Sequence, residues 1–237
     1  MAAAYRADPG NSATDRFEVA ALAEAQRYLV GNNGKKLADD PAAHEQVAEA
    51  LHTEFGDTPE SIAYYLGVVD TADFDTGQRL ANKILTLPAA DRIRRQAQME
   101  LDRFGLIGKP FNPALKAQDG KRVDFKVPGS VTVLYVWSET RGANSWLALA
   151  RAKSALPPNT RFVYLALDTT PGQMAAAMGR VPFAGTPCVE PGGPTSPALK
   201  GLKVRRVPFV YVGNDKGVLT GYGPPAQLPA LLAAASR

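Results

Sequence analysis

The chain has 237 residues, of which 45% are hydrophobic and 21% charged, and its formal net charge is +4. This composition excludes an intrinsically disordered protein, because enough apolar side chains are present to build a core, and the length accommodates two domains. No apolar run approaches the roughly 20 residues that a membrane-spanning helix requires.

A single cysteine, Cys188, excludes an intramolecular disulfide and a metal centre built on several cysteines. The first residues lack the basic and apolar stretches of a secretory signal peptide, so we expect a soluble protein of the cytoplasm, or of the periplasm if a signal peptide has been removed. His44 and His52 are more than two helical turns apart, too far to share one metal ion, and we expect both to be solvated. No metal or other cofactor is expected.

The charge is divided unevenly along the chain. Residues 1–105 carry 11 Lys and Arg against 17 Asp and Glu, whereas the remaining residues carry 16 against 6. An acidic first part and a basic second part suggest complementary docking between domains. Binding of nucleic acid by the basic part is the alternative, but its cations are scattered and lack the aromatic interleaving of such a site. We therefore expect no nucleic-acid partner.

Up to about Gly105 the sequence shows helical periodicity and no strand pattern. Apolar residues recur at helical spacing, and capping residues, prolines and glycines mark the ends of the runs. The run at 60–69 is strongly apolar and should lie at the centre of its layer. We predict an all-α helical array over residues 1–105, with helices at 15–30, 41–55, 60–69, 71–87 and 89–104.

After Gly105 the pattern changes to strands that alternate with short helices. VTVLYVW (131–137) is a continuous apolar run, typical of a strand that is buried on both faces of a sheet. Other strands are predicted at 123–127, 161–168, 203–212 and 214–223, and helices at 145–153, 169–179, 198–202 and 224–236. The stretch 181–197 is rich in Pro and Gly, and the residues around Cys188 in it are expected to form a strand or a loop before the strand at 203–212. Residues 106–237 thus form an α/β sandwich around a central mixed sheet, which makes the whole a two-domain α+β protein.

This second part resembles the thioredoxin-like superfamily, and within it the thiol-disulfide reductase and redoxin branch. GKPFNPALKAQDGKRVDF resembles the first segment of that branch, VTVLYVW its central strand, and VRRVPFVYVGNDKG the segment that carries its cis-proline. The motifs occur in the right order over about half of the chain. The resemblance implies a thioredoxin-like α/β sandwich over residues 106–237.

The active-site motif of the branch is missing. In its redox-active members the central strand ends in W-x-x-x-C-x-x-C, where the first cysteine attacks as a thiolate and the second resolves the mixed disulfide. Here Trp137 keeps the tryptophan, but Arg141 occupies the attacking position and Asn144 the resolving one. Neither can act as a sulfur nucleophile, so dithiol exchange at this turn is excluded. The resemblance therefore implies the fold of the branch but not its thiol-disulfide exchange activity.

Cys188 is the remaining candidate for redox chemistry. One-cysteine peroxide chemistry needs a thiolate that nearby cations stabilise, and Arg205 and Arg206 would have to supply them. The alternative is a small, inert, partly buried cysteine, which we favour because nothing near Cys188 in the sequence marks an activated thiol.

The resemblance also implies a docking groove beside the lost motif. Pro208 stands at the position of the cis-proline, which leaves the backbone of Val207 free to bind an extended peptide. A trans proline that opens a strand is the alternative.

Arg141 adds a positive charge to a turn whose helix N–H groups attract anions, so the turn is a candidate site for a peptide carboxylate or phosphate. Arg205 and Arg206 should lie at the same rim if the fold is right. In the alternative, Arg141 points into solvent and pairs loosely with Glu139.

Two functions remain open at this point. The first is a redox-inactive thioredoxin-like protein that serves as a binding or scaffold module for a peptide, a protein partner or a small anion. The second is a thiol-disulfide oxidoreductase or peroxiredoxin-like protein with residual chemistry through Cys188. A hydrolase is excluded, because residues 106–237 contain no histidine that could act as a base for Ser138 at the turn. The sequence favours the first function.

Overall fold

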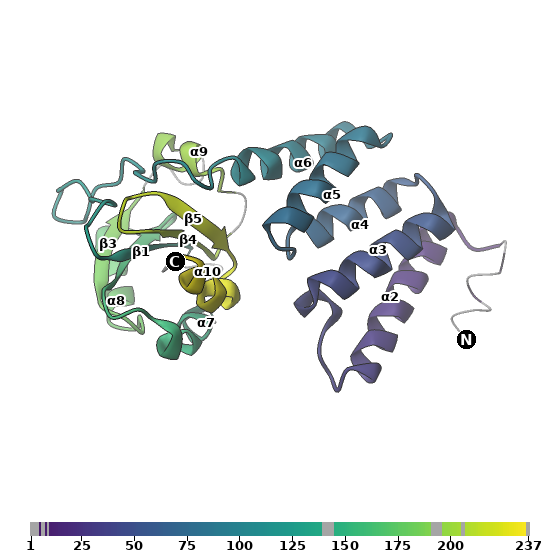
Figure 1. Ribbon diagram of the computed structural model, residues 1–237, viewed down its shortest axis with the longest axis horizontal. Helices are drawn as coiled ribbons and strands as arrows, with labels where there is room; N and C mark the ends of the chain where they lie inside the picture. The colour runs from purple at the N-terminus through teal and green to yellow at the C-terminus, as the bar shows by residue number, and fades with distance from the viewer. Residues whose placement is uncertain are drawn as a thin grey trace. The chain divides into compact units, whose positions relative to one another are not determined.

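The computed structural model of the protein describes Tyr5, Asp8 and residues 10–138, 145–190, 196–204 and 207–235. The chain divides into two compact units (Figure 1), a helical unit of residues 1–104 and an α/β unit of residues 105–237. The division falls one residue before the boundary drawn from the sequence. In the described part of the chain, no helix combines the length and the apolar character that a membrane span requires.

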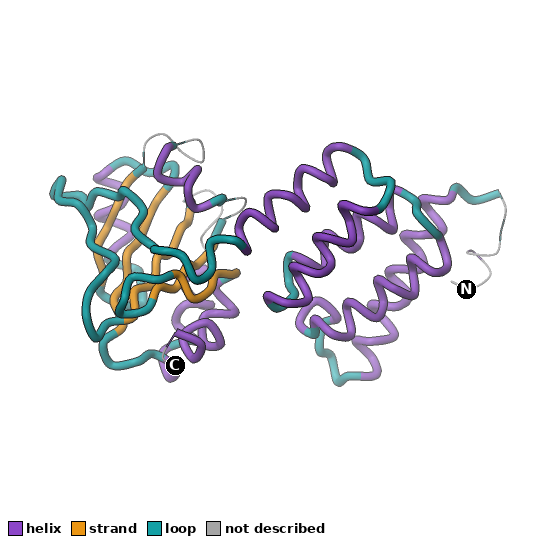
Figure 2. The backbone as a smooth tube through the Cα atoms, turned by 45° about the horizontal axis from the view of Figure 1, so that its top comes forward, coloured by secondary structure: helices purple, strands orange, loops and turns teal. Residues whose placement is uncertain are grey.

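The helical unit contains no strand between residues 10 and 104. Its helices are α2 (Ala13–Gly31), the short 3₁₀ helix η1 (Leu37–Asp39), α3 (Pro41–Phe55), α4 (Pro59–Val69), α5 (Phe74–Thr86) and α6 (Asp91–Phe104). Four of these helices begin at a side-chain cap that accepts a hydrogen bond from a backbone N–H three residues on, namely Ser12, Asp40, Thr58 and Asp73. Consecutive helices lie side by side (Figure 2), so the predicted helical array is confirmed.

Helix α4 lies at the centre of this array, as its apolar sequence predicts. It is buried at six of its positions, and it contacts α2, α3, α5 and α6. The hydroxyl of Tyr65 in α4 donates to Glu49 Oε2 of α3 at 2.9 Å and accepts from Lys83 Nζ of α5 at 2.8 Å. Lys83 Nζ also lies 2.7 Å from both carboxylate oxygens of Glu49, so one polar network joins three helices.

The α/β unit is built on a five-stranded mixed sheet in the order β3-β2-β1-β4-β5. Its strands are β1 (Val131–Trp137), β2 (Thr160–Ala166), β3 (Gly185–Val189), β4 (Phe209–Gly213) and β5 (Leu219–Gly223). The pairs β1–β2 and β2–β3 are parallel, whereas β1–β4 and β4–β5 are antiparallel. β1 is buried along its whole length, as its continuous apolar run predicts.

Helices cover both faces of the sheet. α7 (Ser145–Arg151), α8 (Pro171–Met178) and α10 (Leu228–Ala235) pack on the face that includes Tyr135 and Trp137 of β1. α9 (Pro197–Leu202) and residues 106–127, here called the wrapping segment, pack on the face that includes Leu134 and Val136. Because successive side chains of a strand point to opposite faces, the continuous apolar run of β1 supplies both cores.

The wrapping segment also covers both edges of the sheet. At β5, Gly108 N–H donates to Leu219 O at 2.8 Å, and Leu219 N–H donates to Lys109 O at 3.0 Å. At β3, Gln118 N–H donates to Pro187 O at 2.9 Å. In Figure 2 the segment is the long loop that passes over the sheet between these edges. Backbone groups that would otherwise be unpaired on two edge strands are thus partly satisfied within the chain.

The structure differs from the predicted strands in two places. β3 lies within the Pro/Gly-rich stretch 181–197, where the sequence left a strand and a loop open around Cys188 and the structure has the strand. Pro187 is compatible with an edge strand, where its missing N–H costs no ladder bond. Conversely, residues 123–127 form no strand: Val123 and Phe125 are buried and alternate with exposed residues, but Val123 N–H bonds to Leu115 O inside the wrapping segment. The alternation of apolar and polar residues thus predicted the buried side chains correctly, but these residues pair within the wrapping segment and not with a strand of the sheet.

Arg94 fixes the connection between α5 and α6. Its guanidinium donates to three backbone carbonyls, of Leu85 at 3.1 Å, Leu87 at 2.7 Å and Ala89 at 3.0 Å. These carbonyls lie at the end of α5 and in the loop that follows, where helix geometry leaves acceptors without intrahelical partners.

We expect Arg94→Ala to lower the free energy of unfolding by about 1–3 kcal/mol, because three acceptors lose a charged donor. Urea denaturation measures the change. Arg95→Ala is the matched control: its side chain is exposed, and the substitution should cost less than about 0.5 kcal/mol. Equal stability of the two variants would contradict this role of Arg94.

Candidate functional site

The candidate site lies at the carboxyl edge of the parallel strands. β1, β2 and β3 run parallel and end at Trp137, Ala166 and Val189, so their carboxyl ends meet on one side of the sheet, where ligands of open α/β sheets bind. Ser138, directly after β1, is buried and donates its hydroxyl proton to Asp168 Oδ2 at 2.6 Å. This short charge-assisted bond ties the ends of the two strands together.

The antiparallel strand β4 brings the segment around Pro208 to the same edge. Val136 of β1 is paired with Phe209 of β4, so the register places Pro208 beside Trp137. The Val207–Pro208 peptide bond is cis, which is the geometry expected from the resemblance. Val207 is partly buried and packs against the core under α9. Trp137 and Pro208, which were singled out from the sequence, therefore lie side by side, whereas the side chain of Val207 packs on the opposite face of the sheet from Trp137.

The central part of the predicted turn lies outside the described residues. Glu139, Arg141 and Asn144 belong to it, and so do Arg205 and Arg206 on the neighbouring segment. The structure describes the residues on both sides of these two stretches, and these flanking residues form the described part of the candidate site.

Two buried polar atoms at the strand ends have no hydrogen-bond partner among the described residues. Trp137 is 2% exposed and its ring packs edge-on against Trp146 with centroids 4.9 Å apart, but its Nε1–H donates to no acceptor in the part of the chain that the structure describes. Thr169, just after Asp168, is 6% exposed and its Oγ1 is also unpartnered. Buried donors are nearly always satisfied in folded proteins, so such atoms often mark sites where a ligand or water completes the bonding.

Cys188 lies in the core and lacks the solvent exposure of a reactive thiol. It is in β3, paired with Leu165 of β2 on one side and bridged to Ala117 of the wrapping segment on the other. The residue is fully buried, and burial raises the pKa of its thiol to about 12. The expected small, partly buried cysteine is in fact completely buried.

The two histidines of the helical unit are not solvated as expected. His44 is half-buried, its ring packs edge-on against Tyr64 at 5.4 Å, and burial lowers its pKa. His52 Nε2 lies 3.3 Å from Asp57 Oδ1. Because these positions face neighbouring helices, the rings fill space inside the array. No cluster of three or more His, Cys, Asp or Glu suited to a metal occurs in the described part of the chain.

Sequence reasoning missed Asp168 and Thr169. The signal that could have found them is positional, since a carboxylate and a hydroxyl follow the second parallel strand just as Ser138 follows the first. It considered Ser138 only as a hydrolase nucleophile, whereas the structure shows its hydroxyl bound to Asp168.

Comparison with solved structures identifies the fold. A thioredoxin-like protein from Bacteroides caccae is 10% identical, with 91% of this chain and 92% of that chain covered and a TM-score of 0.52. A thioredoxin-like protein from Aeropyrum pernix is 12% identical over 60% of this chain and 97% of that one, with a TM-score of 0.43. A secreted disulfide oxidoreductase of Mycobacterium tuberculosis is 18% identical over 51% and 93%, with a TM-score of 0.39.

The α/β unit thus has a thioredoxin-like fold, as the resemblance predicted. No family model and no curated protein matches the chain. At 10% identity the likeness concerns the arrangement of helices and strands alone, so the function must be argued from the site.

We expect Cys188 to be nearly inert toward Ellman's reagent in the folded protein. At pH 8 the reaction should be at least about a hundredfold slower than in denaturant, because the thiolate is the reacting species and the buried thiol stays protonated. The raised pKa also means that stability falls as pH rises from the unfolded-state pKa toward about 12, since only the unfolded chain then ionises the thiol. Rapid labelling under native conditions would contradict the burial.

Proposed function

We propose that this chain is a redox-inactive thioredoxin-like binding module whose vestigial site docks a peptide or a small anion without transforming it. The observation that carries the proposal is the environment of Cys188, the one cysteine of the sequence. Its thiol is fully buried and its pKa is raised to about 12. At neutral pH such a thiol is protonated and shielded from substrates, so neither disulfide exchange nor peroxide reduction has a nucleophile.

The alternative is residual oxidoreductase or peroxiredoxin-like chemistry through Cys188. It requires an accessible thiolate next to a cation. Cys188 is instead enclosed between Leu165 and Ala117 in the core. The same burial that supports the binding module therefore weighs against this alternative.

The groups at the carboxyl edge support a docking role. Trp137 and Pro208 lie side by side there, and Ser138 and Asp168 hold the edge in one arrangement. The Nε1–H of Trp137 lacks an acceptor among the described residues, and the carbonyl or carboxylate oxygens of a peptide are acceptors. In the proposal the backbone of Val207 pairs with the extended peptide, as in the fold family that the sequence resembles.

The charges proposed to hold the ligand are those of Arg141, Arg205 and Arg206, with Glu139 as a competing partner of Arg141. Their assignment follows from the sequence positions, which place them next to Trp137 and Val207 along the chain. A guanidinium binds a carboxylate or phosphate through two parallel hydrogen bonds, which favours an anionic ligand at this rim. The helical unit offers a second surface to a protein partner.

Insulin reduction by dithiothreitol should proceed at the background rate in the presence of the protein, from neutral to moderately alkaline pH. The reason is that Arg141 and Asn144 replace both thiols of the turn and Cys188 is buried. The turbidity of precipitating insulin chains measures the rate.

The double variant Arg141→Cys with Asn144→Cys restores C-x-x-C and serves as the matched control, since activity on the same scaffold shows that the assay can detect it. Turnover by the wild-type chain that persists in Cys188→Ser would disprove redox silence at the turn. Turnover that disappears in Cys188→Ser would establish the alternative function.

A further inference from the structure

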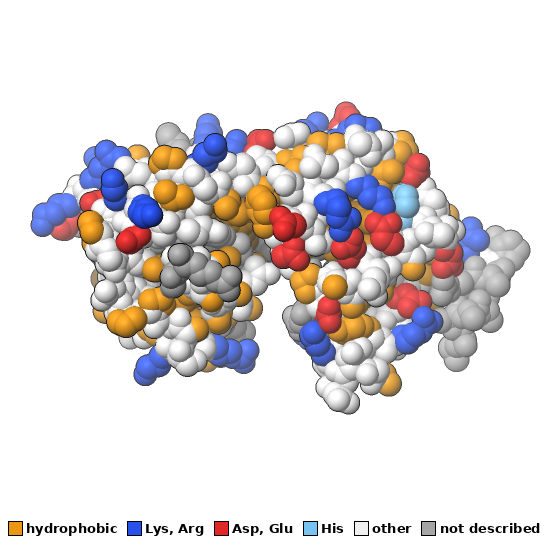
Figure 3. Space-filling view, in the orientation of Figure 1, with side chains coloured by type: hydrophobic (Ala, Val, Ile, Leu, Met, Phe, Trp, Pro, Cys, Tyr) orange, Lys and Arg blue, Asp and Glu red, His pale blue; other side chains and the backbone are white. Residues whose placement is uncertain are grey.

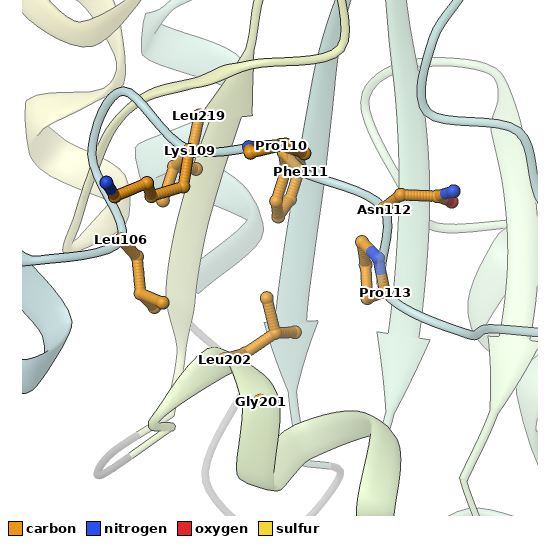
Figure 4. A pocket seen from close by; sticks show the side chains of 9 residues that line it. All are labelled: Leu106, Lys109, Pro110, Phe111, Asn112, Pro113, Gly201, Leu202 and Leu219. Carbon is orange, nitrogen blue, oxygen red and sulfur yellow. The ribbon is translucent and has the colours of Figure 1, made fainter.

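A second concave site lies away from the strand-end turn, between the wrapping segment, α9 and β5. It is a cavity of about 200 Å³ whose floor is formed by Phe111, Leu202 and Leu219. All three side chains are buried. Figure 4 shows Leu106 and Pro113 on opposite sides of this floor, with Leu202 reaching up from α9. Lys109 and Asn112 supply the polar groups of the lining.

The pocket is held in shape by the backbone. Phe111 N–H donates to Gly217 O at 2.7 Å, and Leu219 N–H donates to Lys109 O at 3.0 Å, so the wrapping segment is joined to the start of β5 and to the turn before it. Pro110 and Pro113 fix two backbone φ angles of the wall. A rigid apolar recess loses little entropy when it is filled, which favours binding.

The size of the pocket indicates what it can hold. Pockets for drug-sized ligands and cofactors measure roughly 300–1,000 Å³. A cavity of about 200 Å³ instead matches a single aromatic or branched side chain. The mouth of the pocket is open to solvent, because three residues of its lining are exposed, namely Pro110, Asn112 and Gly201. A peptide that places one side chain in the pocket can therefore continue across the mouth on both sides.

The charges around the pocket indicate which residues should flank the bound side chain in the ligand. Lys109 lies in the lining, and Lys200 directly precedes Gly201 on the opposite wall; both are exposed. The wrapping segment carries five cations against two carboxylates, namely Lys109, Lys116, Lys121, Arg122 and Lys126 against Asp119 and Asp124. In Figure 3, Lys and Arg side chains predominate over the part of the α/β unit where α9 and the wrapping segment lie, next to apolar patches. A partner of opposite charge is favoured there.

We propose that this pocket binds one aromatic or branched apolar side chain of an acidic peptide segment in a partner protein. The apolar side chain fills the recess above Phe111, Leu202 and Leu219, and the flanking carboxylates pair with Lys109 and Lys200. The site is separate from the vestigial turn and does not depend on the proposed function, because none of its lining residues belongs to the strand-end site.

A capped, fluorescein-labelled peptide Asp-Asp-Phe-Asp-Asp tests this by fluorescence anisotropy with the full chain carrying Arg141→Ala, which removes a charge proposed to bind anions at the strand-end turn. Binding should saturate, weaken as salt is added, and be weaker by about tenfold or more for Asp-Asp-Ala-Asp-Asp, which lacks the buried ring. Lys-Lys-Phe-Lys-Lys should not bind measurably. Lys109→Glu should weaken binding of the acidic peptide, whereas Lys153→Glu, an exposed lysine outside the pocket lining, should not.

Gly201→Leu fills the pocket mouth and has a matched control. A Cβ at Gly201 meets no atom within 4 Å, and the same holds for Gly172 of α8, which does not line the pocket. Gly201→Leu should weaken binding about tenfold or more, and Gly172→Leu should leave it unchanged. Equal binding by both variants, or equal binding of the Phe and Ala peptides, would overturn the proposal.

Two further outcomes are decisive. In the wild-type chain, the methyl NMR signals of Leu202 and Leu219 should shift on peptide addition, whereas that of Leu232, on the opposite face of the sheet, should not. Absence of these shifts at saturating peptide would overturn the proposal. A concentration-dependent dimer that Gly201→Leu abolishes, with no peptide affinity, would assign the pocket to a second copy and likewise overturn it.

Discussion

The burial of β1 on both faces is the constraint on which the α/β unit depends. All residues of Val131–Trp137 are buried, and the strand is paired along its length with β2 in parallel and with β4 antiparallel. A strand in this position needs apolar side chains at odd and even positions alike, which explains the uninterrupted run VTVLYVW. Its register also fixes the site: Trp137 faces Ala166 in β2, and Val136 faces Phe209 in β4. The ends of β1 and β2 and Pro208 lie at one edge of the sheet because the register of β1 with β2 and β4 places them there.

Local patterns predicted most of the fold because most elements are encoded locally. Helix starts at Pro41 and Pro59 follow from Asp40 and Thr58, whose side chains each accept a hydrogen bond from a backbone N–H of the helix turn that follows, and β1 has the bounds that its apolar run indicates. β3 could not be found in this way. A Cβ at Gly185 would lie 2.6 Å from Phe162 O, so this glycine is needed for close packing on β2, whereas in the sequence it suggests only a loop. Strand formation at 185–189 is decided by the neighbouring strand.

In the candidate site, too, the residues encoded by local motifs could be predicted and those that depend on contacts between distant segments could not. The resemblance supplied Trp137 and Pro208, because the motifs that surround them are contiguous in the sequence. The bond between Ser138 and Asp168 joins residues 30 positions apart and depends on the parallel register of β1 and β2. The burial of Cys188 likewise depends on a partner from the wrapping segment. Once the register is known, the proposed redox-inactive character and the proposed docking edge have one origin: the scaffold keeps its strands while the one cysteine of the sequence lies inside the core.

The central claim is that the edge beside Trp137 binds a ligand and leaves it unchanged. The sequence has two tryptophans, so ¹H–¹⁵N NMR resolves two indole N–H signals, which Trp146→Phe assigns. While an extended acidic peptide is titrated, the Trp137 signal should move saturably in the wild type and in Gly201→Leu, but far less in Arg141→Ala, and mass spectrometry should recover the peptide intact. A Trp137 signal that stays in place at millimolar peptide, or that moves equally in Arg141→Ala, would contradict the account.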